Sequence, residues 1–168
     1  MPEKNDIQQN ILISEPITSI VLQKIFFSYE KRKPVLKELN LGFEKGKINY
    51  LQAPNGFGKT TVVDLIFGLY QPQEGQIIIN NKYKLNELNL IKWREKIAYA
   101  EHENLIENGL STGQKQLVEL NRLFDNSKNK EIFIFDEADN ALDENNKKGF
   151  RQKLEKISKN KLVILVSC

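Results

Sequence analysis

The chain has 168 residues, of which 28% are charged and 40% hydrophobic, and its net charge is +3. This composition is typical of a soluble globular protein, and so small a net charge gives no reason by itself to expect nucleic-acid binding. The one cysteine, Cys168, excludes an internal disulfide, which fits a reducing compartment. The longest apolar runs, 132–135 and 162–166, are far shorter than the roughly 20 residues of a membrane-spanning helix. The polar N-terminus lacks the apolar core of a signal peptide, so we expect a cytoplasmic protein, with a membrane partner on another chain left open.

Residues 1–16 are expected to form a polar lead-in and residues 17–168 a single domain. Short runs rich in β-branched and aromatic residues predict strands at 19–27, 47–52, 76–80, 97–100, 131–136 and 162–167. Three of these runs are almost continuously apolar, as is typical of strands buried on both faces of a parallel sheet. Amphipathic segments between the strands predict helices at 59–69, 88–95, 112–124 and 143–158. This alternation of strands and helices predicts an α/β core with right-handed crossovers.

The stretch "NYLQAPNGFGKTTVVDLIF" has the order strand, glycine-rich loop and apolar helix, which is the context that a phosphate-binding loop requires. Backbone N–H groups from Asn55 to Thr61 can point at phosphate oxygens, and the helix N-terminus adds a partial positive charge. Lys59 is expected to reach the β- and γ-phosphates, and the Thr60 hydroxyl to ligate Mg²⁺. Ala53 stands where the pattern has its first glycine, a change that an extended residue 53 tolerates. The alternative is a glycine turn before an ordinary helix.

Two acidic residues follow the apolar run "IFIF" directly, so they lie at the C-terminal end of a predicted buried strand. Ligands of open α/β sheets bind at that edge. We expect Asp136 to help hold Mg²⁺, and Glu137 to polarise an attacking water as a general base. The alternative is a surface turn that caps the next helix.

Between the loop and the carboxylates lies "LSTGQ", residues 110–114, in which Ser111 begins a predicted helix and Gly113 allows close backbone approach. This is either a second anion site or a plain helix N-cap. The motif resembles the LSGGQ signature of the ATP-binding cassette (ABC) ATPases. The motif order, "PNGFGKTT" as Walker A, the signature, "IFIFDE" as Walker B and then "ALD", is also that of the family, and "FFSY" with "PVLKELNLGFEKGK" resembles the opening of an exporter-type domain. The resemblance covers about residues 17–168.

The resemblance implies a P-loop NTPase of the α/β class, with a mostly parallel sheet flanked by helices and an N-terminal antiparallel β portion. It implies that Tyr29 stacks on adenine, that Thr61 adds an α-phosphate contact, and that Glu137 is the catalytic carboxylate. ATP would be bound by residues of the loop, the opening and the signature: Tyr29, Asn55, Gly56, Phe57, Gly58, Lys59, Thr60, Thr61, Ser111, Gly113 and Gln114. Mg²⁺ would be held by Thr60 and Asp136.

The family pattern also implies partners. Residues 141–143 form the D-loop, which in this family crosses a dimer interface, and the signature of one subunit covers the γ-phosphate bound by the other. We therefore expect a head-to-tail dimer, with itself or with a second ABC subunit, and a separate transmembrane subunit through which ATP hydrolysis powers export. The expected location is cytoplasmic or peripheral on the inner face of the cell membrane, and no nucleic-acid partner is expected.

The sequence departs from the family pattern in the groups that complete the site. Thr112 replaces the first signature glycine, and its β-branched side chain is stiff where the backbone should approach phosphate. His102 stands in place of the Q-loop glutamine, where it is either a water-binding catalytic residue or a surface histidine. Cys168 stands in place of the H-loop histidine, and a thiol cannot supply a strong donor contact to phosphate. Only seven residues separate His102 from Leu110, so the helical subdomain is much reduced.

These departures motivate an alternative, a degenerate ABC module that binds ATP, hydrolyses it poorly and acts as regulator or partner of a competent subunit. An ABC ATPase of the DNA-repair or chromosome-structuring kind is a third reading, but the long coiled-coil insert of such proteins is absent from this sequence. The lysine-rich segment 146–161 has mixed charge at helical spacing, which is typical of a solvated helix face, with membrane or nucleic-acid contact as the less favoured alternative.

Overall fold

The computed structural model describes residues 10–30, 33–101, 112–140 and 142–167, and for 112–116 the backbone alone. The chain forms two compact units. Unit 1 comprises Met1–Gly42 and Gly56–Glu95, and unit 2 comprises Phe43–Asn55 and Lys96–Cys168. The chain passes from unit 2 into unit 1 between Asn55 and Gly56, inside the predicted phosphate loop.

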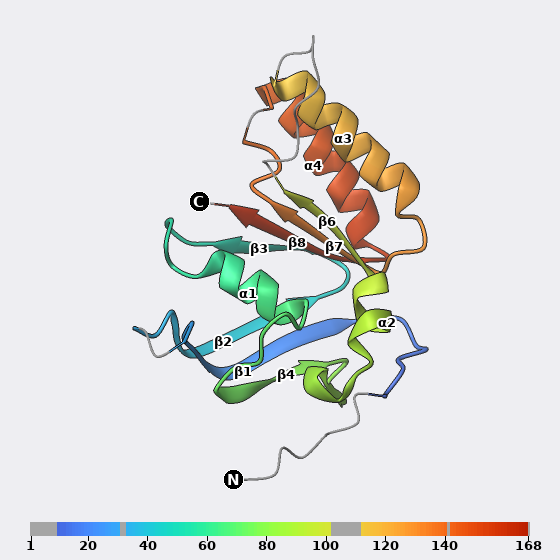
Figure 1. Cartoon of the computed structure of the whole chain (residues 1–168). Coiled ribbons are helices and arrows are strands. Elements are labelled where there is room, and N and C mark those ends of the chain that lie inside the picture. The colour runs from blue at the N-terminus through green and yellow to red at the C-terminus, as the bar shows by residue number, and fades with distance from the viewer. Residues whose placement is uncertain (1–9, 31–32, 102–111, 141, 168) are drawn as a thin grey trace, which may run out of the picture. The chain divides into compact units, whose positions relative to one another are not determined.

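Unit 1 is built on a four-stranded sheet of order β2-β1-β4-β5, the antiparallel portion that the family pattern predicted (Figure 1). Its strands are β1 (Ser19–Phe27), β2 (Leu36–Glu44), β4 (Glu74–Ile79) and β5 (Tyr83–Lys84). β4 runs antiparallel to both β1 and β5. The unit also contains helix α1 (Lys59–Ile66), the 3₁₀ turn η1 (Leu85–Glu87) and the short helix α2 (Leu90–Glu95).

Helix α1 ends three residues earlier than predicted, and the reason is Gly68. Its φ of 67° is left-handed, and its N–H donates to the Leu65 carbonyl at 3.0 Å, which closes the last turn. A Cβ at this position would lie 2.8 Å from the Leu90 side chain, so glycine is needed both for the conformation and for the packing.

The segment before β1 pairs with residues 87–89 of the same unit. The Ile11 N–H donates to the Glu87 carbonyl at 3.2 Å and the Asn89 N–H to the Ile11 carbonyl at 2.9 Å, while Ile13 and Ile17 are buried. The division of the chain at residue 16 stays a prediction.

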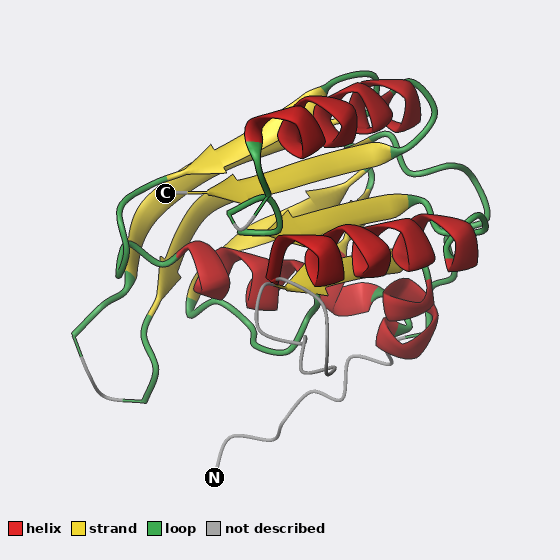
Figure 2. Ribbon diagram, turned by 90° about the horizontal axis from the view of Figure 1, so that it is seen from above, coloured by secondary structure: helices red, strands yellow, loops and turns green. Residues whose placement is uncertain are grey.

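Unit 2 contains a second four-stranded sheet, of order β3-β8-β7-β6, in which every neighbouring pair is parallel. Its strands are β3 (Ile48–Gln52), β6 (Ile97–Glu101), β7 (Ile132–Asp136) and β8 (Leu162–Ser167). Parallel neighbours require crossover connections, and two of these contain helices α3 (Thr112–Asn126) and α4 (Glu144–Ser158). In Figure 2 these crossover helices are red and the strands yellow. The parallel α/β core predicted from the sequence is confirmed.

Helices α3 and α4 lie side by side over one face of this sheet (Figure 1). The apolar layer between them and the strands is rich in phenylalanine: Phe124 from α3 and Phe150 from α4 meet Phe133 and Phe135 of β7, with ring centroids 5.3–6.3 Å apart. β6 ends at Glu101 and α3 begins at Thr112, so only residues 102–111 connect them. The helical part of the fold is therefore reduced, as predicted. No helix formed by the described residues has the length and apolarity to cross a bilayer.

Candidate nucleotide-binding site

The predicted phosphate loop connects the end of β3 to the start of α1. The Ala53 N–H donates to the Ser167 carbonyl at 3.4 Å, so the pairing of β3 with β8 continues one residue beyond the strand. Ala53 is not among the described residues with positive φ. The structure therefore shows why alanine fits here: the residue continues the strand and does not need the conformational freedom of glycine.

The two glycines of the loop, Gly56 and Gly58, are required by its backbone conformation. Gly56 has φ of 82° and Gly58 has φ of 86°, both left-handed. Gly58 is the N-cap residue of α1, and a Cβ on it would lie 2.8 Å from the Leu36 side chain. A side chain at Gly56 would meet no atom within 4 Å, so there the backbone angle alone favours glycine.

The N-terminus of α1 has the character of an anion site. No side chain caps it, and its first turn contains no acidic residue that would repel an anion. Lys59 is 8% exposed and Thr61 is 4% exposed, while the Thr60 side chain is exposed. A buried lysine next to a helix N-terminus places positive charge where a phosphate would bind.

Tyr29, the predicted adenine contact, also lies in unit 1. Its ring makes edge-to-face contacts with Phe27 and Tyr70, at centroid distances of 4.9 and 5.2 Å. These aromatic rings line an open hollow of about 520 Å³. The Tyr29 hydroxyl lies 3.1 Å from Thr61 Oγ1 and donates to Asp64 Oδ2 at 3.3 Å, so the aromatic cluster reaches helix α1 directly.

Unit 2 places the predicted carboxylates at the C-terminal edge of its parallel sheet. Asp136 is the last residue of β7, level with Glu101 of β6 and Val166 of β8. Tyr99 of β6 donates a hydrogen bond of 3.3 Å to Asp136 Oδ2. Asp136 therefore has the edge position that a metal-binding carboxylate of this sheet needs.

Glu137 follows with a φ of 51°, which is left-handed and rare for glutamate. Its N–H donates to the Val166 carbonyl at 3.0 Å, and Asn140 Nδ2 donates to its carboxylate at 3.0 Å. The sequence reasoning missed Asn140, Tyr99 and Asp64. Only Asn140 had a signal that could have found it, since it stands three residues after Glu137 in a turn.

Asp143 of the predicted D-loop caps helix α4. Its carboxylate accepts from the Asn146 N–H at 2.8 Å, and Leu142 before it is buried. The sequence left open the alternative that the turn of Asp136 and Glu137 caps the next helix. In the structure, Asp143 caps that helix.

Several predicted site residues lie outside the described part of the chain: His102, Ser111, Ala141 and Cys168. Gly113 and Gln114 lie in the first turn of α3, where only the backbone is described. The roles of all these residues, and of those placed above, stay predictions.

A glycine loop between a parallel strand and an uncapped helix N-terminus, with acidic residues at the C-terminal edge of the same sheet, defines the P-loop class of nucleotide-binding proteins. Residues 36–109 match the family model described as ABC transporter. The subtilin transport ATP-binding protein SpaT of Bacillus subtilis is 31% identical over 133 residues, which cover 76% of this chain and 21% of that protein. Multidrug resistance protein 1 of Plasmodium falciparum is 36% identical over 92 residues, which cover 54% of this chain and 6% of that protein.

Among solved structures, a bacterial Atm1-family ABC exporter with ATP bound shares the fold with a TM-score of 0.82. The match has 19% sequence identity and covers 95% of this chain and 36% of that chain. The chain belongs to the ATP-binding domains of the ABC family, as its motifs predicted. It spans only 21%, 6% and 36% of the length of these three proteins.

Proposed function

We propose that this chain is the ATP-binding and ATP-hydrolysing part of an ABC transporter and powers export through a separate membrane-spanning partner. The observation that carries the proposal is the loop of Gly56 and Gly58, which leads into an uncapped helix with the buried Lys59. The transport ATP-binding proteins among its relatives support the coupling to transport.

The residues present fit ATP with Mg²⁺. Unit 1 supplies the positive charge and helix N-terminus that phosphates need, together with an aromatic hollow of about 520 Å³ suited to a base. Among the residues that the structure describes, no cluster of three or more His, Cys, Asp or Glu could hold a metal without a ligand. A nucleotide-bound Mg²⁺ needs only one or two protein oxygens in addition to phosphate oxygens. Thr60 and Asp136 are oxygen donors of the kind that Mg²⁺ prefers.

In this proposal each residue has a defined task. Lys59 neutralises the β- and γ-phosphates, Thr61 contacts the α-phosphate, and Tyr29 stacks on the base. Glu137 accepts a proton from the attacking water as general base, with its carboxylate held by Asn140. Mg²⁺, when bound, neutralises the charge that develops on the transferred phosphoryl group.

The signature residues Ser111, Gly113 and Gln114 would act on a nucleotide bound by a second subunit. The D-loop and the signature then make each ATP site composite, and the active form is a head-to-tail dimer, with itself or with a related subunit. His102 would bind the attacking water and the metal from the Q-loop. The cytoplasmic face of the membrane is the location that this function requires.

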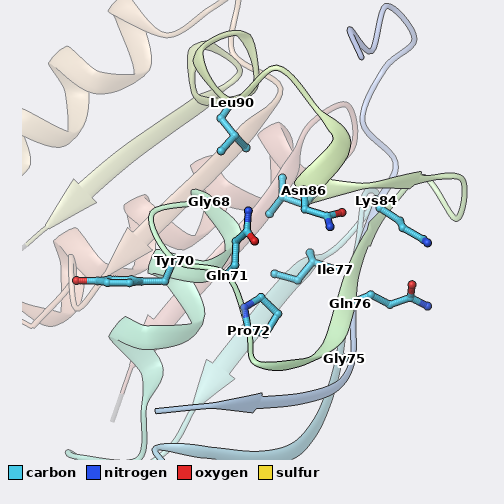
Figure 3. Close-up of a pocket in the computed structure, with 11 residues that line it drawn as sticks. Gly68, Tyr70, Gln71, Pro72, Gly75, Gln76, Ile77, Lys84, Asn86 and Leu90 are labelled. Carbon is cyan, nitrogen blue, oxygen red and sulfur yellow. The ribbon is translucent and has the colours of Figure 1, made fainter. Parts of the chain in front are cut away.

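Unit 1 also has a surface suited to a membrane partner. Leu69, Tyr70 and Ile91 are large side chains that are 55%, 45% and 70% exposed. Tyr70 lines a pocket of about 200 Å³ together with Gly68, Leu90 and the amide side chains of Gln71 and Asn86 (Figure 3). Exposed apolar side chains beside a pocket are typical of interaction sites, and we propose that the membrane-spanning partner docks there.

The test of the function is Mg-ATP turnover by the purified protein. Glu137→Gln should abolish phosphate release while ATP binding persists, and Lys59→Ala should weaken binding itself. Equal turnover by wild type and Glu137→Gln would show that Glu137 is not the base. The relatives lend no support to a degenerate module. ATP binding without turnover, restored by a second ABC protein, is the result that would favour that module.

A further inference from the structure

The hydroxyl groups of Tyr29 and Thr61 share a single chain of hydrogen bonds that ends on Asp64. The Tyr29 oxygen lies 3.1 Å from Thr61 Oγ1 and 3.3 Å from Asp64 Oδ2. An ionised carboxylate only accepts hydrogen bonds, so the one phenol proton points to Asp64. The Thr61 hydroxyl must then donate its own proton to the phenol oxygen.

This arrangement engages the Thr61 hydroxyl, which is the group that is proposed to contact a phosphate. A phosphate oxygen is an acceptor, so Thr61 can contact it only by donating the proton that the phenol now holds. Burial and, to a smaller extent, the negative charge of Asp64 raise the pKa of the Tyr29 phenol, so the phenol stays a donor to Asp64. The docked phenol and a nucleotide therefore compete for Thr61.

The backbone next to Tyr29 is fixed, which confines the competition to side chains. The Gln73 side-chain amide holds Ser28 at both ends, accepting from its N–H and donating to its carbonyl, each at 2.9 Å. The Gln73 N–H also donates to the Phe26 carbonyl at 3.0 Å. Release of Thr61 then requires the Tyr29 ring to rotate away from α1, toward the hollow that it lines.

We infer that Asp64 is a positioning residue that latches the Tyr29 phenol onto Thr61, so that nucleotide binds only when this latch opens. The inference rests on the proposed nucleotide site and adds to it an internal competitor that lowers the affinity for ATP. When only a fraction of the molecules is in the conformation that can bind, the apparent Kd is the intrinsic Kd divided by that fraction. Asp64 sets that fraction because it holds the phenol proton.

The test is the Kd of Mg-ATP by titration calorimetry on the whole chain, with thermal melting to confirm that each variant is folded. Asp64→Ala and Tyr29→Phe each remove one end of the latch and should bind ATP about tenfold more tightly, the shift expected if the open state is a tenth of the population. Asp64→Asn keeps an acceptor oxygen for the phenol and should remain close to wild type. The double variant, Tyr29→Phe with Asp64→Ala, should gain nothing beyond Tyr29→Phe.

The latch would be overturned if Asp64→Ala binds ATP with the affinity of wild type or more weakly. It would also be overturned if the effects of the two single variants on the Kd add up in the double variant. If Asp64→Ala does not fold, an unchanged or weaker ATP affinity of Tyr29→Phe would overturn the latch instead. Lys59→Ala separates this failure from that of the proposed function. If wild type binds no ATP, or binds it equally well without Lys59, the nucleotide site itself is wrong.

Discussion

At the scale of single residues, Glu137, the proposed general base, has a backbone conformation that neighbouring groups hold in place. A left-handed glutamate costs about 1–3 kcal/mol and persists only where its surroundings enforce it. Here the enforcing contacts are the bond from its N–H to the Val166 carbonyl and the turn in which the Asn140 N–H donates to the Glu137 carbonyl at 3.2 Å. These bonds fix the direction of the carboxylate, which Asn140 Nδ2 then holds at 3.0 Å.

Asn140→Ala should therefore lower kcat for ATP while KM changes little. The expected loss is about tenfold, which corresponds to the ~1.5 kcal/mol of a hydrogen bond to a charged group. Asn140→Asp should lose more, because a second carboxylate repels Glu137 from the position of the amide. Steady-state phosphate release measures both variants, and unchanged kcat in Asn140→Ala would show that the contact has no part in the reaction.

Asp64 gives the stability of the fold a dependence on pH. Burial raises the pKa of this carboxyl, and the hydrogen bond from Tyr29 lowers it by less. An acid with a raised pKa in the folded state stabilises the fold fully below its ordinary pKa of 3.8, and that contribution is lost as pH rises through the raised value. Asp64→Asn should thus be more stable than wild type at neutral pH, and the gain should shrink as the pH falls toward 4.

Urea unfolding of both proteins between pH 4 and 8 measures this difference. Glu44→Gln is the control of opposite sign, because the hydrogen bond from Lys47 lowers the pKa of Glu44. Its substitution removes stability at neutral pH, by a small amount since the pair is exposed. A stability difference for Asp64→Asn that does not vary with pH would contradict the assignment.

At the scale of elements, prediction from the sequence succeeded for strands rich in β-branched and aromatic residues. β7 was predicted within one residue, because its β-branched and aromatic residues run without interruption. β1 was predicted at both ends, although Gln23 and Lys24 interrupt its apolar residues and its pairing with β4 shifts register between Gln23 and Phe26. Strand β2 was missed. Glu38 takes a φ of 48° there, and the half-buried or buried residues shift from Leu36 to Leu39, Leu41 and Phe43. An extra residue of this kind is a β-bulge, and it hides the period of two on which the prediction depends.

The same reasoning explains which site residues could be predicted. The residues of the phosphate loop follow one another in the sequence, and so do the two carboxylates, so each motif is visible from its spacing alone. The Tyr99–Asp136 and Tyr29–Asp64 bonds join residues 37 and 35 positions apart. Such pairs depend on sheet register and on side-chain rotamers, neither of which the order of residues displays.

Helix α4 supplies a prediction at this scale. Asp143 caps it through the Asn146 N–H, and the Asn146 side chain returns a bond of 2.9 Å to Asp143 Oδ2. Asp143→Ala should cost about 1 kcal/mol of unfolding free energy, as the loss of an N-cap does. Asp143→Ser keeps a capping oxygen and should cost much less. Chemical denaturation of the two variants measures the difference, and equal losses would mean that Asp143 acts otherwise than as a cap.

At the scale of the whole molecule, one of the connections between the two units lies inside the predicted phosphate loop. The chain crosses between them at three places: at Gly42–Phe43, inside the phosphate loop at Asn55–Gly56, and between Glu95 and Lys96. The alternation of strands and helices predicted the parallel sheet, and the resemblance carried by the motif order predicted the antiparallel portion and the class of protein. That the boundary between the units falls inside the glycine loop was not predictable from the motifs, because it depends on tertiary contacts.

The proposed phosphate loop leads to a prediction about assembly. If signature and loop from two chains complete each ATP site, bound ATP is part of the interface, and blocking hydrolysis should preserve that interface. Glu137→Gln with Mg-ATP should therefore elute as a dimer in size-exclusion chromatography with light scattering, and without nucleotide as a monomer. Adding Lys59→Ala to this variant should abolish the dimer, because the ATP between the subunits is lost. A monomer that demonstrably holds ATP would contradict self-association and point to a second ABC subunit as the partner.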